Sequence, residues 1–446
     1  MSAESESSDF SGKRVLKGGL VVAVGLGAAQ ATGFARQVVF GYLLGTGPEA
    51  DALSAALAPL ELWWAVMGLA VIFGFTPRLA ETGALGGYAF REVARPVIQI
   101  GLASTAVLVV FAGPILRMFA PGLDYETAEL GTSLLRVTGF TAALAGWTFA
   151  YSALLYSRRR FALPALHAAV VNIVTIIVAL TFYSRLGVYS FAAGYVGGAF
   201  IQLIVSYLYS RKLVKQQTEA ANPDLKMDFR TLFTGPGPIL LQSLVLEANT
   251  AVSRAYASTF GAGMTAAFEY GYKVYRVPFA ILVVPLSESL LPEVSSLDDS
   301  PEQRSKAVGA LKRASLAAFA AGAVVMVALI VLRRPVVRLL FERGEFGAKS
   351  TEAVATALAS YMPVVIGRGL TELLSRTLFG MGIYRQPGVA AGIALAINCL
   401  ISVMLPPRWP MLIGLGAIVG FGVSASLVVR HVWTMGTTTN ASEPRA

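Results

Sequence analysis

The sequence predicts an all-α polytopic membrane protein of about twelve transmembrane helices. These helices are expected to form two six-helix lobes, related by a pseudo-two-fold axis along the membrane normal. Three observations predict this fold class: an apolar composition, a succession of long hydrophobic runs, and a repeat between the two halves of the chain.

The composition is typical of an integral membrane protein. Of the 446 residues, 55% are hydrophobic and only 14% are charged, and the mean hydropathy is +0.64. Soluble domains carry roughly a quarter charged residues. A water-soluble chain of this length could not hide so much apolar surface in its core.

Hydrophobic runs separated by polar residues give the expected spans, each near the roughly 20 residues that a crossing helix needs. The spans are 15–44, 52–77, 96–118, 129–156, 162–183, 187–210, 231–260, 264–296, 309–332, 352–379, 388–405 and 410–434. They define an N-terminal lobe (15–212), a linker (213–230) and a C-terminal lobe (231–434), between tails 1–14 and 435–446.

The charges of the loops predict the orientation. Most loop Lys and Arg, including Arg158, Arg159 and Arg160, fall on one side if both termini share that side. Because cytoplasmic loops carry the basic excess, both termini are predicted to be cytoplasmic, in a bacterial plasma membrane. The polar, acidic N-terminal tail has no basic n-region, so we expect no cleaved signal peptide. The exception is the basic stretch 333–349, which we expect outside, along the membrane surface.

The second half of the chain repeats the first in order, roughly 220 residues later. Gly45-Thr46-Gly47 is answered by Gly261-Ala262-Gly263, Pro114-Ile115-Leu116-Arg117-Met118 by Pro335-Val336-Val337-Arg338-Leu339, and Pro164 with Asn172 by Pro387 with Asn398. Six helices per repeat is an even number, so both halves enter the membrane from the same side. A cavity between the two lobes is expected.

Several classes of protein are excluded. A single cysteine, Cys399, allows no internal disulfide, and His167 and His431 are too distant to suggest a metal site. The net charge of +10 fits basic cytoplasmic loops beside anionic lipid, so no nucleic-acid partner is expected. The chain has no nucleotide motif, metal-ligand cluster or paired acids on a long loop, so no catalytic residues and no enzyme are predicted.

Ionisable residues inside the spans are costly and are therefore candidates for function. They are Arg36, Asp51, Glu61, Glu247, Arg254, Glu269, Lys273, Arg276, Glu288, Arg368, Glu372 and Arg376. Their spacing is helical: Glu269 and Lys273 are one turn apart, and Arg368, Glu372 and Arg376 form an i, i+4, i+8 series. Such faces line either a hydrated cavity or a neighbouring helix.

These charges have two interpretations. Arg36, Lys273 and Arg276 suit a cationic cavity that binds phosphate or diphosphate, whereas the 368–376 series is equally well explained as ion pairs that hold the bundle together. The acids Asp51, Glu61, Glu247 and Glu288 are alternative sites for Na⁺ or proton coupling. Asp51 is also explained as an ordinary acid at a helix N-terminus. No other cofactor is expected.

Several motifs resemble the MurJ/MviN family of lipid II flippases. They are Gly33-Phe34-Ala35-Arg36, Glu49-Ala50-Asp51-Ala52, Pro77-Arg78-Leu79-Ala80-Glu81, Arg160-Phe161-Ala162-Leu163-Pro164-Ala165 and Leu340-Phe341-Glu342-Arg343-Gly344-Glu345-Phe346. The resemblance covers about Gly33 to Asn398. It implies the multidrug/oligosaccharidyl-lipid/polysaccharide exporter fold. It also implies alternating-access transfer of a polyprenyl-diphosphate-linked saccharide, such as a lipid II-like peptidoglycan precursor, from the inner to the outer leaflet.

The family's cavity arginines carry over only in part. Arg36 fits the second arginine of the first helix and Lys273 fits the eighth-helix arginine, with Arg276 one turn on. Gln30 stands at the first of these arginine positions, and Trp63 and Trp64 stand at the second-helix pair. Bacterial members usually have two more C-terminal helices that form a groove for the lipid tail, and the spans counted above stop at the twelfth.

This departure keeps several functions open. The chain is expected to be a divergent flippase, monomeric in the bilayer, with cell-envelope synthesis proteins as partners. The alternatives are a non-transporting scaffold or degenerate flippase of cell-envelope synthesis, or an exporter of another amphiphile. A drug exporter would need a net acidic or aromatic cavity, which the basic first and eighth helices disfavour. Trp63 and Trp64 could stack on a sugar or isoprenoid, or pack within the bundle.

Overall fold

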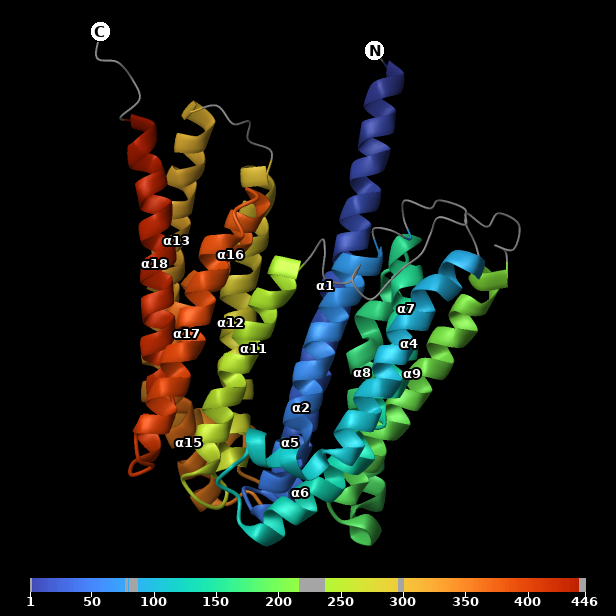
Figure 1. The fold of residues 1–446 in the computed structure, drawn as a ribbon, viewed down its shortest axis with the longest axis vertical. Helices are drawn as coiled ribbons and strands as arrows, with labels where there is room; N and C mark the ends of the chain where they lie inside the picture. Colours follow the sequence, from blue (N-terminus) through green and yellow to red (C-terminus); the bar gives the residue numbers. More distant parts are fainter. Residues whose placement is uncertain (1, 77–78, 80–86, 216–236, 296–300, 441–446) are drawn as a thin grey trace. The chain divides into compact units, whose positions relative to one another are not determined.

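A computed structural model describes residues 2–76, 79, 87–215, 237–295 and 301–440. The described elements are helices, as the sequence predicts, and Figure 1 shows them in sequence colours. The chain divides into two compact units. Unit 1 is Met1–Leu43, Pro59–Ile115 and Glu129–Gly237, and unit 2 is Leu44–Ala58, Leu116–Ala128 and Pro238–Ala446.

The elements of the first half are long helices with two short ones. They are α1 (Ser2–Leu44), α2 (Pro48–Ala70), a π-helical turn η1 (Val71–Phe75), α4 (Gly87–Val110), α5 (Ala112–Phe119), α6 (Tyr125–Thr138), α7 (Thr141–Ser157), α8 (Ala162–Leu186) and α9 (Tyr189–Lys215).

The second half repeats this order. Its elements are α11 (Gly237–Ser258), α12 (Met264–Ser295), α13 (Pro301–Val331), α14 (Arg333–Phe341), α15 (Ala348–Tyr361), α16 (Val364–Gly380), α17 (Arg385–Met404), the 3₁₀ turn η2 (Pro410–Leu412) and α18 (Leu415–Asn440). The short helix α14 follows α13 as α5 follows α4, so the predicted repeat is present in the order of the elements.

Each half ends with a closely packed pair of helices. In unit 1, α8 and α9 lie side by side (Figure 1), and a Cβ at Gly194 or Gly198 would come within 2.8 Å of the α8 backbone. In unit 2, α17 and α18 pack in the same way, with Gly416 and Gly420 against Asn398 and Ala394. Both pairs use two glycines four residues apart, the spacing that lets membrane helices approach closely.

Three predicted spans are broken. The span expected over 96–118 is α4 followed by α5, which are bent by 83°. The span expected over 352–379 is α15 followed by α16, bent by 47° where Pro363 precedes α16. The span expected over 129–156 is interrupted between α6 and α7, at Gly139 and Phe140. Proline and glycine permit such breaks where neighbouring helices satisfy the backbone.

The membrane assignment rests on length and composition. In the part of the chain that the structure describes, six helices are long and apolar enough to cross a bilayer, or eight if each bent pair is one span. The window in α13 is only 11% buried inside the protein, which is typical of a helix that faces lipid.

The Leu340–Phe346 motif has a structural explanation. Phe341 and Phe346 are buried, and their rings pack on the ring of Tyr270 at 5.3 and 5.4 Å between centroids. Gly344 supplies a positive φ of 61° that turns the chain back between the two rings. The motif therefore anchors the segment after α14 to α12.

Candidate functional site

A buried carboxylate joins two cations inside unit 2. Glu269 on α12 accepts a hydrogen bond of 2.7 Å from Arg254 Nη2 on α11. It also forms an ion pair with Lys273 Nζ at 2.9 Å. Arg254 and Glu269 are almost fully buried, whereas 23% of the Lys273 side chain is exposed. Because Lys273 follows Glu269 by one helical turn, the sequence predicts their proximity. Arg254 reaches Glu269 from another helix, α11, and spacing along α12 does not predict that contact.

Arg368 makes a second set of contacts from α16. Its Nη1 donates to Thr250 Oγ1 at 2.8 Å, and its Nη2 donates to Glu247 Oε1 at 3.2 Å. The guanidinium also lies 5.7 Å from the ring centroid of Phe279 and 6.0 Å from that of Phe421. Hydrogen bonds and aromatic faces together compensate the burial of this charge. Arg368 therefore connects α16 to α11.

The 368–376 series does not act as a continuous ladder. Arg376 pairs with Glu372 at 2.8 Å, whereas Arg368 turns to Glu247 on another helix. Arg276 is half-buried and lies near Tyr272 and Glu247, and it forms no ion pair with any carboxylate that the structure describes.

The described side chains of this cluster, which we call the α11–α12–α16 network, carry an excess of positive charge. Five cations stand against three carboxylates, and the members are Arg254, Lys273, Arg276, Arg368, Arg376, Glu247, Glu269 and Glu372. Arg254 and Arg368 are buried, and protein groups accept hydrogen bonds from their Nη atoms. Lys273, Arg276 and Arg376 are partly accessible.

Arg36 lies in unit 1 and has a different environment. Its Nη1 donates to Asn172 Oδ1 at 2.9 Å, and its guanidinium lies 4.7 Å from the centroid of the Tyr195 ring. Only 8% of the residue is exposed, and Nε has no hydrogen-bond partner. Among the residues that the structure describes, no carboxylate neutralises Arg36. An amide and aromatic rings hold this cation while leaving its charge uncompensated.

The two tryptophans differ in their contacts. Trp63 Nε1 donates to Ser104 Oγ at 2.7 Å, and its ring lies 6.3 Å from that of Phe149. Trp63 therefore packs α2 against α4 and α7 within unit 1. Trp64 and Glu61 are half-buried on α2, and Gln30 is exposed on α1.

Asp51 caps the N-terminus of another helix, α12. It lies in the first turn of α2, but its carboxylate accepts backbone N–H groups of Gly263 and Ala266 at the start of α12. The bond to Ala266 is 2.7 Å. A carboxylate at a helix N-terminus satisfies unpaired N–H groups and complements the helix dipole. Glu288 belongs to α12, but its side chain lies outside the described residues.

Some residues of the site could not be chosen from the sequence. Thr250 and Asn172 hold Arg368 and Arg36, and neither carries charge. The only signal for Thr250 is its position three residues after Glu247, which places both on one face of α11. In unit 2, Asn398 donates to Ser253 Oγ at 3.1 Å and to Asn249 Oδ1 at 2.9 Å. The repeated Asn172 and Asn398 thus have matching roles: Asn172 joins α8 to α1, and Asn398 joins α17 to α11.

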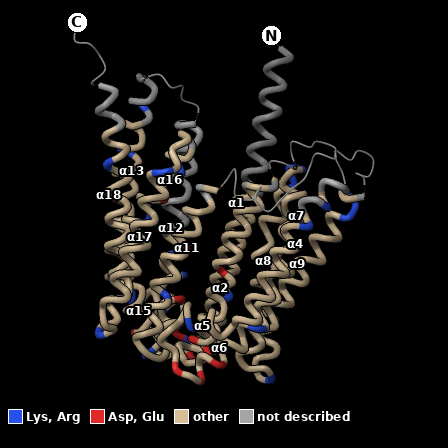
Figure 2. The backbone as a smooth tube through the Cα atoms, viewed as in Figure 1, with Lys and Arg blue, Asp and Glu red and all other residues tan. Residues whose placement is uncertain are grey.

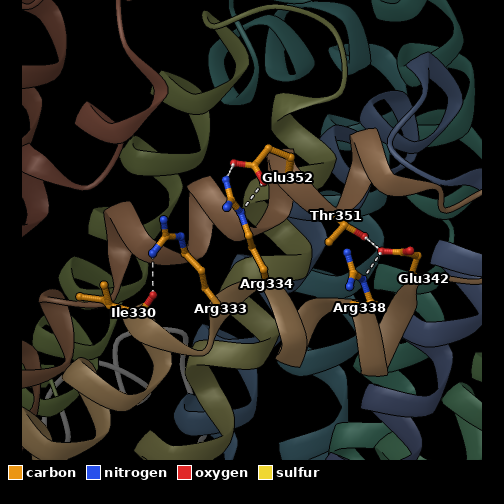
Figure 3. A network of polar contacts seen from close by, with 7 residues as sticks. All are labelled: Ile330, Arg333, Arg334, Arg338, Glu342, Thr351 and Glu352. Atoms are coloured by element: carbon orange, nitrogen blue, oxygen red, sulfur yellow. Dashed lines mark hydrogen bonds and ion pairs between the residues drawn. The ribbon is translucent and has the colours of Figure 1, made fainter.

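Two arginines of the basic stretch after α13 are paired with carboxylates. Arg334 makes two bonds of 2.7 and 2.8 Å to Glu352, and Arg338 pairs with Glu342 at 3.3 Å (Figure 3). Thr351 Oγ1 donates to the Glu342 carboxylate at 2.6 Å, and this bond lowers the pKa of Glu342 below its ordinary value of 4.5. These pairs are exposed, so each contributes little to stability. They are separate from the α11–α12–α16 network.

Comparisons with known proteins identify the family. A family model described as lipid II flippase MurJ matches residues 75–438. A probable lipid II flippase MurJ of Rhizobium meliloti is 24% identical over 400 residues, which cover 84% of this chain and 72% of that relative.

Two solved structures share the fold. The inward closed conformation of a lipid II flippase MurJ has a TM-score of 0.77 and 20% identity, covering 95% of this chain and 91% of that one. An inward-facing multidrug resistance MATE transporter of the MOP superfamily has a TM-score of 0.76 and 13% identity, covering 93% and 96%. The prediction of an all-α, two-lobed membrane fold is confirmed. This chain is a multi-pass membrane protein that belongs to the lipid II flippase MurJ family.

Proposed function

We propose that this protein flips a polyprenyl-diphosphate-linked saccharide, a lipid II-like peptidoglycan precursor or a related glycolipid, from the inner to the outer leaflet by alternating access. The observation that carries the proposal is the net positive charge of the α11–α12–α16 network, placed on helices of a flippase family. A diphosphate is the substrate group that an excess of Arg and Lys fits best.

The residues of the network have distinct roles in this proposal. Lys273 and Arg276 provide the donors for the diphosphate, since both are partly accessible. Glu269, which is itself bound by Arg254, holds Lys273 in place. Arg368, fixed by Thr250 and Glu247, contributes positive potential without leaving its buried position. Arg376 on α16 provides a further cation, whereas Lys273 and Arg276 are on α12.

Replacing both Lys273 and Arg276 with Ala is expected to lower the flipping rate at least tenfold, because two charge-assisted bonds to the diphosphate are lost. The rate is measured with the full-length protein in proteoliposomes that contain a fluorescent polyprenyl-diphosphate lipid. Arg334→Ala with Arg338→Ala removes the same charge from exposed pairs of unit 2 and is the matched control. An unchanged rate in the Lys273/Arg276 variant would contradict the role given to these residues.

Arg36 is expected to act through its charge. Arg36→Lys keeps that charge, although Lys cannot reproduce the fork toward Asn172 and Tyr195, so part of the flipping rate should remain. Arg36→Met removes the charge at similar length and should reduce the rate further. The two variants are compared in the proteoliposome assay at equal amounts of inserted protein. Equal rates in the Lys and Met variants would show that Arg36 has a packing role only.

Coupling to Na⁺ or protons is part of the proposal. Glu247 is the network carboxylate with the most exposure, at 31% of its side chain, so it is the acid best placed to take up a cation. The flipping rate of Glu247→Gln should lose its dependence on the Na⁺ or the proton gradient, whichever drives the native protein. Both gradients are imposed separately across the same proteoliposomes.

A scaffold without transport activity is the second candidate function. It is favoured because Gln30, Trp63 and Trp64 stand where the family has arginines. Trp63 also packs against Ser104 and Phe149 within the protein. Mass spectrometry of the purified protein with bound lipid separates the two functions. A flippase should retain polyprenyl diphosphate lipids, whereas a scaffold should retain none.

The proposed location is the bacterial plasma membrane with both termini in the cytoplasm. The basic residues of the loops support this orientation. Reporter fusions at the two termini, one active only in the cytoplasm and the other only outside it, test the orientation directly.

A further inference from the structure

The turn between α7 and α8 has an unusual backbone for its sequence. Arg159 has a φ of 55°, and in the part of the chain that the structure describes it is the one residue other than glycine with a positive φ. L-residues rarely adopt this conformation, because Cβ approaches the following carbonyl oxygen. An arginine at such a position therefore requires an explanation beyond the turn itself.

The second half of the chain contains the same turn with a different sequence. After α7, Arg160 N–H donates to Leu155 O at 2.8 Å and Arg159 N–H to Tyr156 O at 2.9 Å. After α16, Ile383 N–H donates to Leu378 O at 2.8 Å and Gly382 N–H to Phe379 O at 3.0 Å. Both turns are Schellman motifs, in which the left-handed position favours glycine and the next position favours an apolar residue.

The turn after α16 has both preferred residues, and the turn after α7 has neither. Gly382 takes the left-handed position with a φ of 74°, and Ile383 packs against the cluster that contains Leu378. The corresponding residues in unit 1 are Arg159 and Arg160, both exposed. Two exposed arginines thus stand where glycine and an apolar residue would stabilise the turn best.

The surroundings of the turn indicate the depth of the lipid headgroups. The Arg160 guanidinium lies 5.6 Å from the ring centroid of Tyr209 on α9. Tyr207 and Tyr209 are about half exposed, and aromatic residues of this kind gather where hydrocarbon meets the headgroups. Lys212, one helical turn beyond Tyr209, is also exposed. Figure 2 shows Lys and Arg gathered at this end of unit 1, where α7 and α9 end.

We propose that the Arg159–Arg160 turn is a binding site for the phosphate of an anionic phospholipid headgroup, separate from the α11–α12–α16 network. Neither arginine has a carboxylate partner among the described residues, so both charges are available to a ligand. The Tyr209 ring holds the Arg160 guanidinium in place, and the Arg159 side chain is exposed beside it in the chain. Two adjacent guanidinium groups match a phosphate with several charge-assisted bonds.

The repeat supplies the test variant. Arg159→Gly with Arg160→Ile converts this turn to the sequence found at Gly382 and Ile383, so the variant should fold and unfold at an equal or higher temperature. Its affinity for dioctanoyl phosphatidylglycerol, measured on the purified full-length protein, should fall by roughly 25-fold, about fivefold for each basic residue near the headgroups. Affinity for dioctanoyl phosphatidylcholine should not change.

The control removes the same charge elsewhere. Arg117→Gln with Arg185→Gln replaces two exposed arginines that lie outside the turn, and it should retain the native affinity for phosphatidylglycerol. The single variant Arg160→Gln keeps the backbone of the turn and should still lose about fivefold. Unchanged phosphatidylglycerol affinity in the turn variant, or an equal loss in the control, would overturn the proposal. Complete displacement of the lipid by millimolar inorganic phosphate would overturn the assignment to a lipid headgroup.

Discussion

Replacing Glu269 with Ala is expected to lower the free energy of unfolding by about 3–5 kcal/mol, the largest effect of any single change in the α11–α12–α16 network. Glu269 is buried between Arg254 and Lys273, so its removal leaves two cations without their shared carboxylate. The measurement is thermal or denaturant unfolding of the purified protein in detergent.

An exposed pair in the same unit provides the control for Glu269. Glu352→Ala breaks the bidentate contact between Glu352 and Arg334. Both side chains of this pair are more than half exposed, so the free energy of unfolding should change by less than about 1 kcal/mol. Glu269→Gln should fall between the two, because it keeps the shape but loses the charge. A Glu269→Ala variant as stable as Glu352→Ala would show that the buried cations have other partners.

Replacing Asp51 with Ala is expected to cost about 2–3 kcal/mol of stability. The Asp51 carboxylate accepts two backbone N–H groups at the start of α12, and no solvent replaces it because only 1% of the residue is exposed. Loss of the carboxylate leaves the Gly263 and Ala266 N–H groups unpaired inside the protein. Thermal unfolding in detergent measures the effect.

Asp124 provides a comparison for Asp51. Its carboxylate accepts from Thr127 N and Thr127 Oγ1 at the start of α6, in an exposed position, so Asp124→Ala should cost less. Asp51→Asn keeps one oxygen acceptor and should be intermediate between native protein and Asp51→Ala. Equal losses for Asp51→Ala and Asp124→Ala would contradict the importance given to the buried contacts.

The fold was largely predictable because apolar length and repetition are visible in a sequence. The predicted spans 162–183 and 187–210 correspond to α8 and α9, and the order of elements in the second half repeats that of the first. The breaks between α4 and α5 and between α15 and α16 were not predicted. A hydrophobic run shows only that a segment enters lipid, whereas a bend depends on which neighbours satisfy the backbone at the break.

The candidate site was predictable only within single helices. Spacing along α12 places Lys273 beside Glu269, and the structure shows this pair. Spacing along α16 suggested that Arg368 joins Glu372, but Arg368 contacts Glu247 and Thr250 on α11 instead. Asp51 is the clearest case, because its partners are backbone N–H groups more than 200 residues away in sequence. Contacts between helices depend on packing angles and rotations that one sequence does not reveal.

Complementation of bacteria depleted of their own lipid II flippase tests the central claim most directly. The native chain, expressed in the inner membrane, should restore growth, and the Lys273→Ala/Arg276→Ala variant should fail to do so at equal membrane levels. The Arg334→Ala/Arg338→Ala variant should restore growth like the native chain. Rescue by the Lys273/Arg276 variant would contradict the cationic site. Failure of the well-expressed native chain would contradict the flipping of a lipid II-like precursor.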